Sequence, residues 1–430
     1  MKKGIDYPLF TVIIPQKDRA EYLIHTLRTC MIQDYPNFQI IVSDDNSTDN
    51  SVEVARTLAK QDPRIKVFAH DHHLGMRDNF EFALNQATSG YVMALGGDDG
   101  LTPGCITKMY NILKETGKQL LCWSTATFYY PEQSGGKNIF YINRKQQRGV
   151  RILKSSAFLQ KISATFNYQI EECPMFYMKG VAAVDLVNRV KSRTPDNCFY
   201  YCPTPDGFSG VVLAGEVEDY AFTDEPLSIA GATTKSQGLN YMRTDEKSRK
   251  EAEQFFNDNI RRTMHSELAS QPYSPLQTLM TADYLLTAKD LPGWPGQVPE
   301  ISFEKLLRVT FKRLEKHSMR NEVLVRELKI LREIAIQHNL LDLFNELTKK
   351  TKRRVVREPN VYGFVITNSV RFEGTELGIN NIFDASLATP FLYGFTKRFS
   401  FSYLVQLVRN SIKVILRTRK YKVESLPVID

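Results

Sequence analysis

The sequence has no long apolar run and contains little cysteine or tryptophan. Its 430 residues include six cysteines and two tryptophans. No stretch approaches the roughly 18 consecutive apolar residues of a membrane-spanning helix, and the N-terminus has two lysines but no apolar run of signal-peptide length. The cysteines form no CxxC pair, which favours scattered reduced thiols over a disulfide framework or a zinc site. These absences predict a cytoplasmic protein that works where it is made.

Two nucleotide-binding glycine motifs are also absent. No G-x-G-x-x-G follows a predicted strand and no G-x-x-x-x-G-K-[ST] occurs, which excludes the dinucleotide-binding and P-loop classes. Acidic residues are fewer than basic ones, 48 against 56, so the net charge is +8. This balance favours anionic partners such as nucleotide phosphates, nucleic acid or an acidic membrane surface. No recognised nucleic-acid module accompanies the charge, so we expect no nucleic-acid partner.

Predicted strands and helices alternate along the first 110 residues. Short apolar, β-branched runs predict buried strands at 9–15, 38–43, 65–69 and 91–95. Apolar residues at helical spacing predict helices at about 19–33, 50–60 and 77–87. This alternation is typical of a parallel sheet covered by helices on both faces. Ligands of such sheets collect at the carboxyl ends of the strands.

Beyond residue 110 the pattern is less regular. Apolar runs predict strands at 120–128 and 211–213, and a stretch rich in glycine, glutamine and lysine predicts a loop over 131–150.

The sequence becomes polar and helical in its second half. Helices are predicted within 303–314 and 321–347. A chain of this length exceeds one hydrophobic core, so we expect two domains, with a boundary near residue 240. The prediction is an α/β domain over 1–240 and a mainly helical domain over 241–430.

Two acidic clusters lie where predicted strands end. Asp44 and Asp45 follow the second strand and are compatible with an acidic turn or helix cap. They are also compatible, although less so when taken alone, with a carboxylate that accepts a hydrogen bond from a nucleobase or ribose. Asp98 and Asp99 follow Gly96 and Gly97 at another strand end, either as a Gly-Asp turn or as oxygen ligands for a divalent cation that carries phosphates.

Four motifs in order resemble the family 2 glycosyltransferases of GT-A fold. They are TVIIPQKDR (11–19), IIVSDDNSTDNS (40–51), HLGMRDNFEFALNQATSGY (73–91) and LGGDDG (95–100). The resemblance covers about 8–110 well and extends more loosely to about 235. It implies a GT-A (Rossmann-like), mostly parallel sheet flanked by helices, followed here by the mainly helical C-terminal region.

The resemblance also implies roles for individual residues. Residues 15–18 would line the nucleotide pocket, Asp45 would bind the base, and Arg77 and Asn79 would support the nucleotide. The residues assigned to donor binding are Pro15, Gln16, Asp18, Asp45, Arg77, Asn79 and Asp98. Asp98 and Asp99 would hold Mn²⁺ or Mg²⁺ as the end of the DXD motif. Gly96 stands where that motif has its first acid, which puts one ribose or metal contact in doubt.

Direct displacement at a sugar carbon needs a general base near the acceptor hydroxyl. Asp206, in CPTPDGFSGVVLAG (202–215), resembles the family's acidic residue that precedes a helix in the acceptor half. Asp219 and Glu218 are the alternatives, although EVEDYAF favours a strand with solvated acids. The aromatic segment 174–180 is either part of the acceptor pocket or part of the core.

The predicted function is therefore an inverting, metal-dependent glycosyltransferase. It would move a sugar from a nucleoside diphosphate donor to a hydroxyl acceptor, a glycan or a lipid-linked glycan, in surface polysaccharide synthesis. The alternative is a non-catalytic module that binds sugar nucleotides or glycans through a degenerate DXD motif.

Two further features have competing interpretations. His70, His72 and His73 favour a surface loop over a zinc site, since no further ligand lies near them in the sequence. Between Asp384 and Glu424 there are eight basic residues and no acidic one, on a pattern that separates apolar and basic helix faces. Such a helix can bind an anionic membrane surface, which would place the enzyme at the inner face of the membrane, or it can dock on its own domain.

Overall fold

The computed structural model describes most of the chain. The described residues are 7–134, 136–143, 149–236, 246–258, 263–315, 319–356, 365–366, 369–395 and 421–425.

The larger sheet has eight strands in the order β3-β2-β1-β4-β10-β6-β11-β9. The bounds are β1 (Phe10–Gln16), β2 (Phe38–Asp44), β3 (Ile65–Ala69), β4 (Tyr91–Ala94), β6 (Leu120–Trp123), β9 (Val150–Lys154), β10 (Gly180–Ala183) and β11 (Asp219–Thr223). The first four neighbours are parallel, β10 is antiparallel to both β4 and β6, and β9 is antiparallel to β11. The predicted mostly parallel α/β sheet is confirmed.

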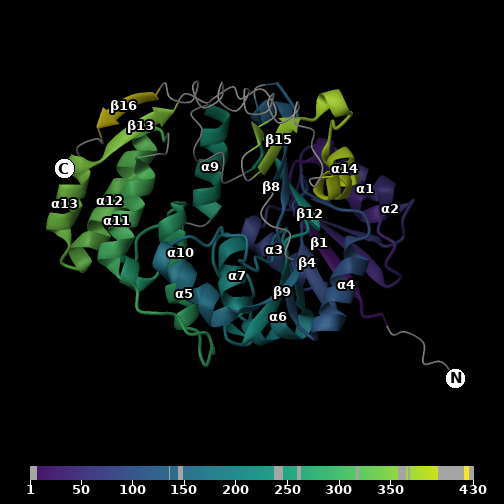
Figure 1. Cartoon of the computed structure of the whole chain (residues 1–430), viewed down its shortest axis with the longest axis horizontal. Helices are drawn as coiled ribbons and strands as arrows, with labels where there is room; N and C mark the ends of the chain where they lie inside the picture. Colours follow the sequence, from purple (N-terminus) through teal and green to yellow (C-terminus); the bar gives the residue numbers. More distant parts are fainter. Residues whose placement is uncertain are drawn as a thin grey trace.

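Helices cover both faces of this sheet because its strands are apolar on both sides (Figure 1). In β1, Val12 and Ile14 pack in one core cluster with α1 (Ala20–Met31), α2 (Ser51–Ala59) and α4 (Cys105–Thr116). Ile13 points to the opposite face and packs with α3 (Met76–Leu84), α5 (Ser155–Thr165), α6 (Val184–Lys191) and α7 (Asp206–Gly215). Successive side chains of a strand alternate in this way, and each fully buried Val or Ile contributes about 1.5–3 kcal/mol.

A second sheet of six strands stands beside the first, in the order β14-β15-β8-β7-β12-β5. The bounds are β5 (Gly100–Leu101), β7 (Ala126–Tyr129), β8 (Ile139–Asn143), β12 (Ser228–Ala232), β14 (Val365–Ile366) and β15 (Ser369–Glu373). The predicted loop over 131–150 was wrong, because η1 (Pro131–Gln133), β8 and the start of β9 lie there. Ile139, Phe140 and Ile142 are buried, and these apolar residues of β8 pair with β7 and β15.

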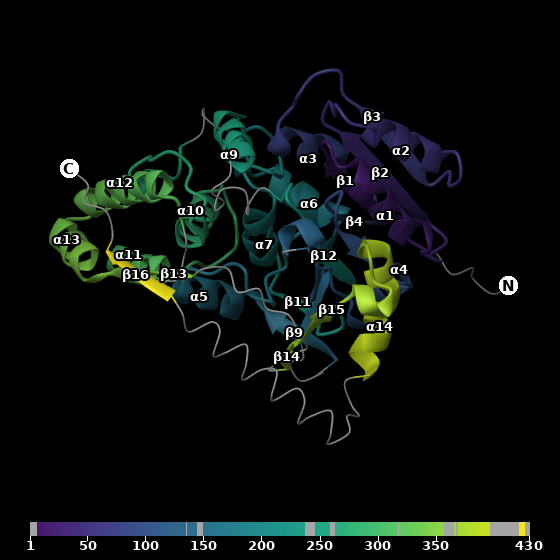
Figure 2. The ribbon, with the colours of Figure 1, turned by 90° about the horizontal axis from the view of Figure 1, so that it is seen from above.

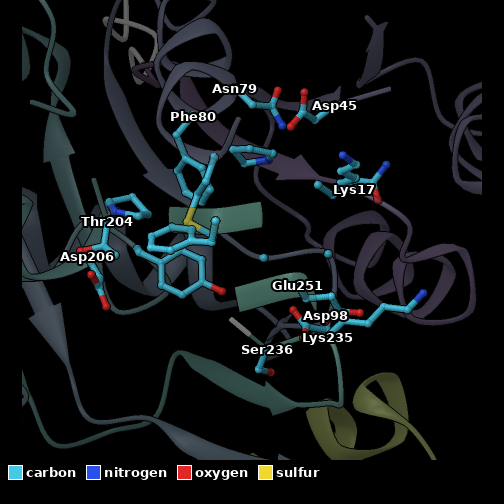
Figure 3. A pocket seen from close by; sticks show the side chains of 18 of the residues that line it. Lys17, Asp45, Asn79, Phe80, Asp98, Thr204, Asp206, Lys235, Ser236 and Glu251 are labelled. Carbon is cyan, nitrogen blue, oxygen red and sulfur yellow. The ribbon is translucent and has the colours of Figure 1, made fainter. Parts of the chain in front are cut away.

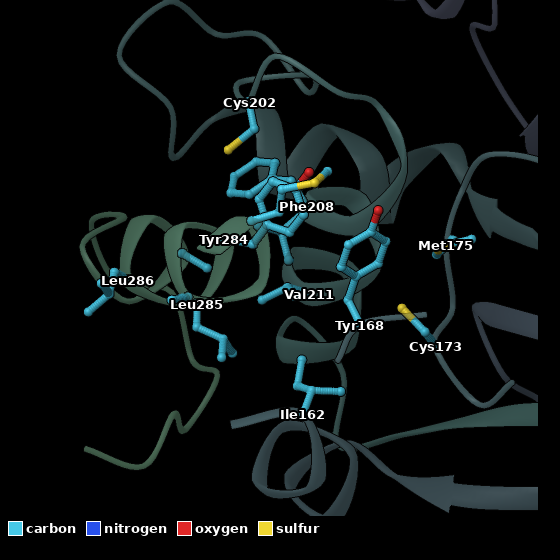
Figure 4. Packing of buried hydrophobic residues seen from close by; sticks show 14 of the residues in the cluster. Ile162, Tyr168, Cys173, Met175, Cys202, Phe208, Val211, Tyr284, Leu285 and Leu286 are labelled. Carbon is cyan, nitrogen blue, oxygen red and sulfur yellow. The ribbon is translucent and has the colours of Figure 1, made fainter. Parts of the chain in front are cut away.

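The short apolar run at 211–213 is helical, which corrects the predicted strand. It lies inside α7, whose residues after Asp206 are all buried between α5 and α10 (Gln277–Lys289). Figure 4 shows Ile162 of α5, Phe208 and Val211 of α7, and Tyr284 of α10 in this cluster. A helix buried all round has no polar stripe, so its sequence resembles a buried strand.

The C-terminal region is mainly helical, as predicted. Its helices are α9 (Glu246–Asp258), α10, α11 (Phe303–Leu314), α12 (Asn321–Gln337) and α13 (Leu341–Lys350). A short antiparallel pair, β13 (Lys352–Val356) and β16 (Tyr421–Ser425), lies beside them, and Figures 1 and 2 both show α9 between α10–α13 and α3. None of the described helices combines the length and apolar character needed to cross a membrane.

The last described helix returns to the first half of the chain. The chain leaves the helical region, adds β14 and β15 to the second sheet, and packs α14 (Ile382–Phe395) against α1. One core cluster extends from Ile13 to Phe344, across the proposed boundary near residue 240. That boundary stays a prediction.

Candidate active site

A cavity of about 770 Å³ opens at the carboxyl ends of β1, β2 and β4. Of the predicted site residues, Pro15, Gln16, Asp18, Asp45, Asn79, Asp98, Asp99 and Asp206 line it. Figure 3 shows Asp45 and Asp206 toward opposite sides of this cavity. Arg77 is not among the lining residues, and its Nε atom donates to the neighbouring Asp78 at 2.9 Å. The role of Arg77 in supporting the nucleotide stays a prediction.

Asp18 ties the loop after β1 to the loop after β2. Its backbone has a φ of +52°, in the left-handed region that Asp tolerates better than most residues. Its Oδ1 accepts hydrogen bonds from the amide of Thr48 at 2.6 Å and of Asp49 at 3.3 Å, and its own amide donates to Ser47 Oγ at 2.8 Å. Because both loops are fixed to each other, this wall of the cavity is preorganised.

Asp45 is buried at the end of β2. Its Oδ1 accepts a hydrogen bond from the amide of Leu74 at 2.6 Å, and its Oδ2 lies 2.8 Å from His73 Nδ1. Asn79, on the first turns of α3, is held by Ser43, whose hydroxyl donates to Asn79 Oδ1 at 2.6 Å. The two side chains are therefore oriented by the strand end, as a binding surface requires.

His73 is connected to the site, although the sequence favoured only a surface loop. Its Nδ1 lies 3.1 Å from Lys17 Nζ, and its Nε2 lies 3.0 Å from Asp258 Oδ2 at the end of α9. Among the described residues no group of three or more His, Cys, Asp or Glu side chains is arranged to hold a metal ion. The contacts that connect His73 come from 56 and 185 residues away, so local sequence gave no signal for them.

Asp98 and Asp99 have different surroundings. Asp99 Oδ2 accepts from the amide of Gly96 at 2.8 Å, its Oδ1 accepts from the amide of Gly231 at 2.9 Å, and the Tyr177 hydroxyl also donates to it. Burial and the charge of Asp98 raise the pKa of Asp99 to about 7. The carboxylate of Asp99 therefore connects three segments of the chain, and its oxygens are largely occupied by these hydrogen bonds.

Asp98 is as buried as Asp99 but makes fewer contacts with backbone amides. Its Oδ2 accepts from Thr233 Oγ1 at 2.9 Å, and its Oδ1 forms an ion pair with Arg19 Nε at 3.6 Å. Arg19 also donates to the backbone oxygen of Lys235 at 2.8 Å, and Lys235 Nζ donates to the backbone oxygen of Asp18. Asp98 thus lies beside two cations that could face a diphosphate. Neither Arg19 nor Lys235 was singled out from the sequence.

Tyr177 packs against Gly96 and leaves no room for a side chain at that position. A Cβ atom on Gly96 would lie 2.5 Å from the Tyr177 hydroxyl and 2.9 Å from both Asp98 Oδ1 and Asp99 Oδ2. Real Cβ contacts are longer than this, so an acid at position 96 would have to displace Tyr177. The phenol occupies the room that a first acidic side chain would need.

The donor set around Asp98 fits a magnesium-like ion that is shared with a phosphate ligand. Mg²⁺ is usually bound by one or two carboxylates together with substrate phosphates and water, without a complete protein cage. Asp98 offers one such carboxylate at the cavity wall, while Asp99 is held by its own hydrogen bonds. The residues present therefore fit a divalent ion that arrives with the donor.

Asp206 is the first residue of α7 and lies in the half of the cavity away from Asp45. Its Oδ2 accepts a hydrogen bond from the Tyr168 hydroxyl at 3.3 Å, and its buried Oδ1 has no hydrogen-bond partner among the described residues. Burial raises the pKa of Asp206 above its ordinary value. A carboxylate with this unpartnered oxygen can accept a proton from a ligand.

The alternatives to Asp206 lie outside the cavity. Asp219 pairs with Lys118 at 2.5 Å, and Glu218 pairs with Lys154 at 2.7 Å on an exposed surface. Neither lines the cavity. In the aromatic segment at 174–180, Phe176 is buried in the core and Tyr177 lines the cavity, and the contribution of the segment to an acceptor pocket stays a prediction.

The first part of the chain is similar to known glycosyltransferases. Residues 11–178 match the model of Glycosyl transferase family 2. The glycosyltransferase GlyG of Streptococcus pneumoniae is 26% identical over 134 residues, which are 31% of this chain and 44% of GlyG. The GalNAc(5)-diNAcBac-PP-undecaprenol beta-1,3-glucosyltransferase of Campylobacter jejuni is 35% identical over 103 residues, 24% of this chain and 33% of that enzyme. The chain thus spans less than half the length of these curated relatives.

Solved structures give a weaker likeness over more of the chain. S. aureus TarS 1–349 in complex with UDP-GlcNAc is 12% identical, with a TM-score of 0.44, over 79% of this chain and 90% of that chain. The mannosyltransferase PcManGT from Pyrobaculum calidifontis, in complex with GDP-Man and Mn²⁺, is 14% identical, with a TM-score of 0.39, over 81% and 88%. The family match includes Asp45, Asp98 and Asp99 and ends before Asp206.

Proposed function

We propose that this chain, whose residues 11–178 match the model of Glycosyl transferase family 2, transfers a sugar from a nucleoside diphosphate donor to a hydroxyl group, with inversion at the sugar carbon. The observation that carries the proposal is a single cavity lined by Asp45, Asp98 and Asp206, which are far apart in the sequence. The acceptor is a glycan or a lipid-linked glycan, in line with the names of two relatives, the undecaprenol-linked glucosyltransferase of Campylobacter jejuni and a putative teichuronic acid biosynthesis glycosyltransferase of Bacillus subtilis.

The half of the cavity around Asp45 suits the donor. Asp45 and Asn79 offer oriented polar groups for the nucleoside, and Arg19 and Lys235 offer positive charge for the diphosphate. A divalent ion bound with the donor at Asp98 would neutralise charge that develops on the departing diphosphate. Asp45 would then recognise mainly the nucleoside of the donor, and the residues near Asp98 would bind its charged diphosphate.

Asp206 performs the proton transfer in the proposed reaction. The acceptor oxygen bonds to the anomeric carbon while the bond from that carbon to the diphosphate oxygen breaks, and its electron pair leaves with the nucleoside diphosphate. The acceptor proton passes to Asp206 Oδ1, which has no other partner among the described residues. Because burial raises the pKa of Asp206, its carboxylate is a stronger base than an exposed aspartate.

The test compares Asp206→Asn with Asp219→Asn. Asp206→Asn should keep donor affinity and reduce turnover by about 10²–10⁴-fold, the usual contribution of a positioned general base. Asp219→Asn is the control, because Asp219 lies outside the cavity and pairs with Lys118. Donor binding by calorimetry and release of nucleoside diphosphate from UDP- and GDP-sugars measure the two quantities.

The non-catalytic alternative, favoured only by Gly96 in the DXD position, predicts a different result. Such a protein would bind sugar nucleotides without releasing nucleoside diphosphate, with or without acceptor. Turnover that falls in Asp219→Asn and persists in Asp206→Asn would instead move the base to Asp219.

A further inference from the structure

The half of the cavity around Asp206 has an aromatic wall that comes largely from the C-terminal helical region. Tyr168 contacts Asp206 directly, and Tyr273 donates to Thr204 Oγ1 at 3.5 Å. The ring of Phe255, on α9, contacts the ring of Tyr273, with ring centroids 5.9 Å apart. The ring of Phe256 contacts that of Phe255 at the same centroid distance. All of these residues line the cavity. The wall therefore joins α9 and the segment before α10 to the start of α7.

Charge is divided unevenly between the two halves of the cavity. Of the described residues that line it, the lysines and arginines are Lys17, Arg19 and Lys235. Each of them contacts the loops after β1, β3 or β4, through His73, Asp98 or Asp18. These positive groups therefore lie in the half of the cavity that is proposed to bind the donor phosphates.

The aromatic half presents negative and neutral groups to the cavity. At this end Asp206 lines the cavity together with hydroxyl and aromatic side chains. Arg326 stacks behind the wall, with its guanidinium carbon 4.5 Å from the centre of the Phe256 ring, but it does not line the cavity. Its charge is paired with the buried Glu327 at 2.5 Å. An anionic ligand at this end would meet a carboxylate and no described cation on the cavity wall.

We propose that the aromatic half of the cavity is an acceptor subsite for a neutral sugar ring, which lies against Phe255, Phe256 and Tyr273 and presents its hydroxyl to Asp206. This inference rests on the proposed function and names the chemical class of its acceptor. A pyranose has an apolar face of C–H groups that can cover an aromatic ring, and hydroxyl groups at its rim that need oriented partners. The buried, unpartnered Asp206 Oδ1 is an oxygen that such a hydroxyl satisfies.

The same geometry disfavours a polyol phosphate as the acceptor group. A phosphodiester placed beside Asp206 would bring a like charge into a partly enclosed site without a neighbouring cation, which costs affinity. Tyr168 is itself oriented, because Gln169 Nε2 donates to its hydroxyl oxygen at 3.3 Å while that hydroxyl donates to Asp206. The polar groups of the subsite are thus fixed before a ligand arrives.

The test measures binding of small probes to the whole chain by saturation-transfer NMR. The neutral probes are the methyl pyranosides of glucose, galactose, mannose and N-acetylglucosamine, and the anionic probes are sn-glycerol 3-phosphate and ribitol 5-phosphate. At least one neutral glycoside should bind, and both polyol phosphates should bind at least about fivefold more weakly. Binding of a polyol phosphate at the aromatic wall, or of no neutral glycoside, would overturn the proposal.

Variants of α9 locate the binding. Phe255→Ala should weaken glycoside binding at least about fivefold, because it removes the ring on which the sugar lies. Phe255→Leu keeps apolar bulk for packing but has no ring face, so it should weaken binding nearly as much while preserving the fold. Lys250→Ala is the matched control on the same helix, since Lys250 is exposed and pairs with Glu246. Unchanged glycoside binding in both Phe255 variants would contradict the assignment.

Donor turnover without acceptor distinguishes this inference from the proposed function. Slow hydrolysis of the donor needs Asp98 and the nucleotide half of the cavity, and it does not need the aromatic wall. If the donor is hydrolysed but no neutral glycoside binds, the acceptor subsite is wrong and the proposed function stands. If glycosides bind through Phe255 but no sugar nucleotide is ever turned over, the subsite stands and the proposed function fails.

Discussion

Adjacent aspartates at the end of β4 have different roles in the structure. Asp99 accepts hydrogen bonds from two backbone amides and a tyrosine, and Asp98 faces the cavity beside Arg19. Asp98→Asn should therefore abolish the metal dependence of donor binding and leave the fold intact. Asp99→Asn should lower the free energy of unfolding by about 1–3 kcal/mol, because a buried donor loses its acceptor. Urea denaturation and donor titration with and without Mn²⁺ measure both effects.

Asp98→Asn and Asp99→Asn serve as controls for each other. Each replaces one buried carboxylate by an amide of the same size, one position apart. If Asp99→Asn loses the metal dependence at unchanged stability while Asp98→Asn keeps it, the two roles are exchanged.

The raised pKa of Asp206 predicts the direction of the pH dependence of turnover. The active form of a general base is the carboxylate, so turnover should rise with pH through the pKa of Asp206 and level off above it. The midpoint should lie above 3.8, the ordinary value. The same shift acts oppositely on stability: the folded protein binds the proton more tightly, so this contribution is present below the unfolded pKa and lost as pH rises through the folded pKa.

Rates at saturating donor and acceptor, measured in wild type and Asp206→Asn, check this prediction. The variant should lack the rising limb. Because burial and the charge of Asp98 also raise the pKa of Asp99, donor affinity must be measured over the same pH range to separate its contribution. A midpoint at or below 3.8, or a rising limb that survives in Asp206→Asn, would contradict the assignment.

Site residues at strand ends could be predicted from the sequence, and residues brought in by long-range packing could not. Asp45, Asp98 and Asp206 were identified because each acid directly follows a predicted strand or precedes a helix within a recognisable motif. Tyr177 and His73 act through contacts with residues distant in sequence, at Asp99 and Asp258. The sequence favoured a core position for the aromatic residues around Tyr177, because composition alone does not say which of them will line a cavity.

At the scale of elements, α7 depends on a close contact at its C-terminal end. A Cβ atom on Gly215 would lie 1.9 Å from Cζ2 of Trp294, and the indole nitrogen of Trp294 donates to the backbone oxygen of Val212 at 3.1 Å. Gly215→Ala must therefore move Trp294 or tilt α7, and it should destabilise the protein by about 1–3 kcal/mol. Because α7 begins at Asp206, turnover should fall more than donor affinity.

Chemical denaturation and donor titration of Gly215→Ala measure these two effects. Ser156→Ala, at an exposed position of the neighbouring α5, is the control and should change stability by less than about 0.5 kcal/mol. A Gly215→Ala protein as stable as this control would show that the Trp294 contact relaxes without cost.

Elements with a clear periodic pattern were predicted closely, and fully buried or long-range elements were not. The strand at 65–69 and the helix at 303–314 were confirmed with their bounds, because one is a short β-branched run and the other has a regular apolar stripe. The helix at 211–213 was mistaken for a strand because it is buried on every side. β8 was missed because its pairing with β15 joins residues more than two hundred positions apart.

At the scale of the whole molecule, the membrane contact of the basic C-terminal segment stays a prediction. Residues 396–420 lie outside the described residues. We predict that this segment brings the enzyme to an anionic membrane surface, since each basic residue near such a surface contributes about 1 kcal/mol before screening. Sedimentation with anionic vesicles should show binding that weakens as salt rises, because exposed charges are screened.

A chain that ends after residue 395 is the comparison for that measurement. It keeps α14 and loses the basic segment together with β16, so it should no longer sediment with the vesicles. Equal, negligible binding by both chains would refute membrane contact. Unfolding of the shortened chain would show instead that the removed part, which includes the β16 strand paired with β13, is structural.

The pairing of β15 with β8 has a consequence for how the protein is made. During translation β8 is synthesised more than two hundred residues before its partner β15. The separation between α1 and its partner α14 is longer still. At the usual 5–20 residues per second, the open edge of β8 persists for roughly 10–50 seconds during translation. An unpaired strand edge is a template for association with other chains. During this interval the nascent protein can therefore be protected by a chaperone until it folds, or it can associate with a chain from a second ribosome on the same message and misassemble.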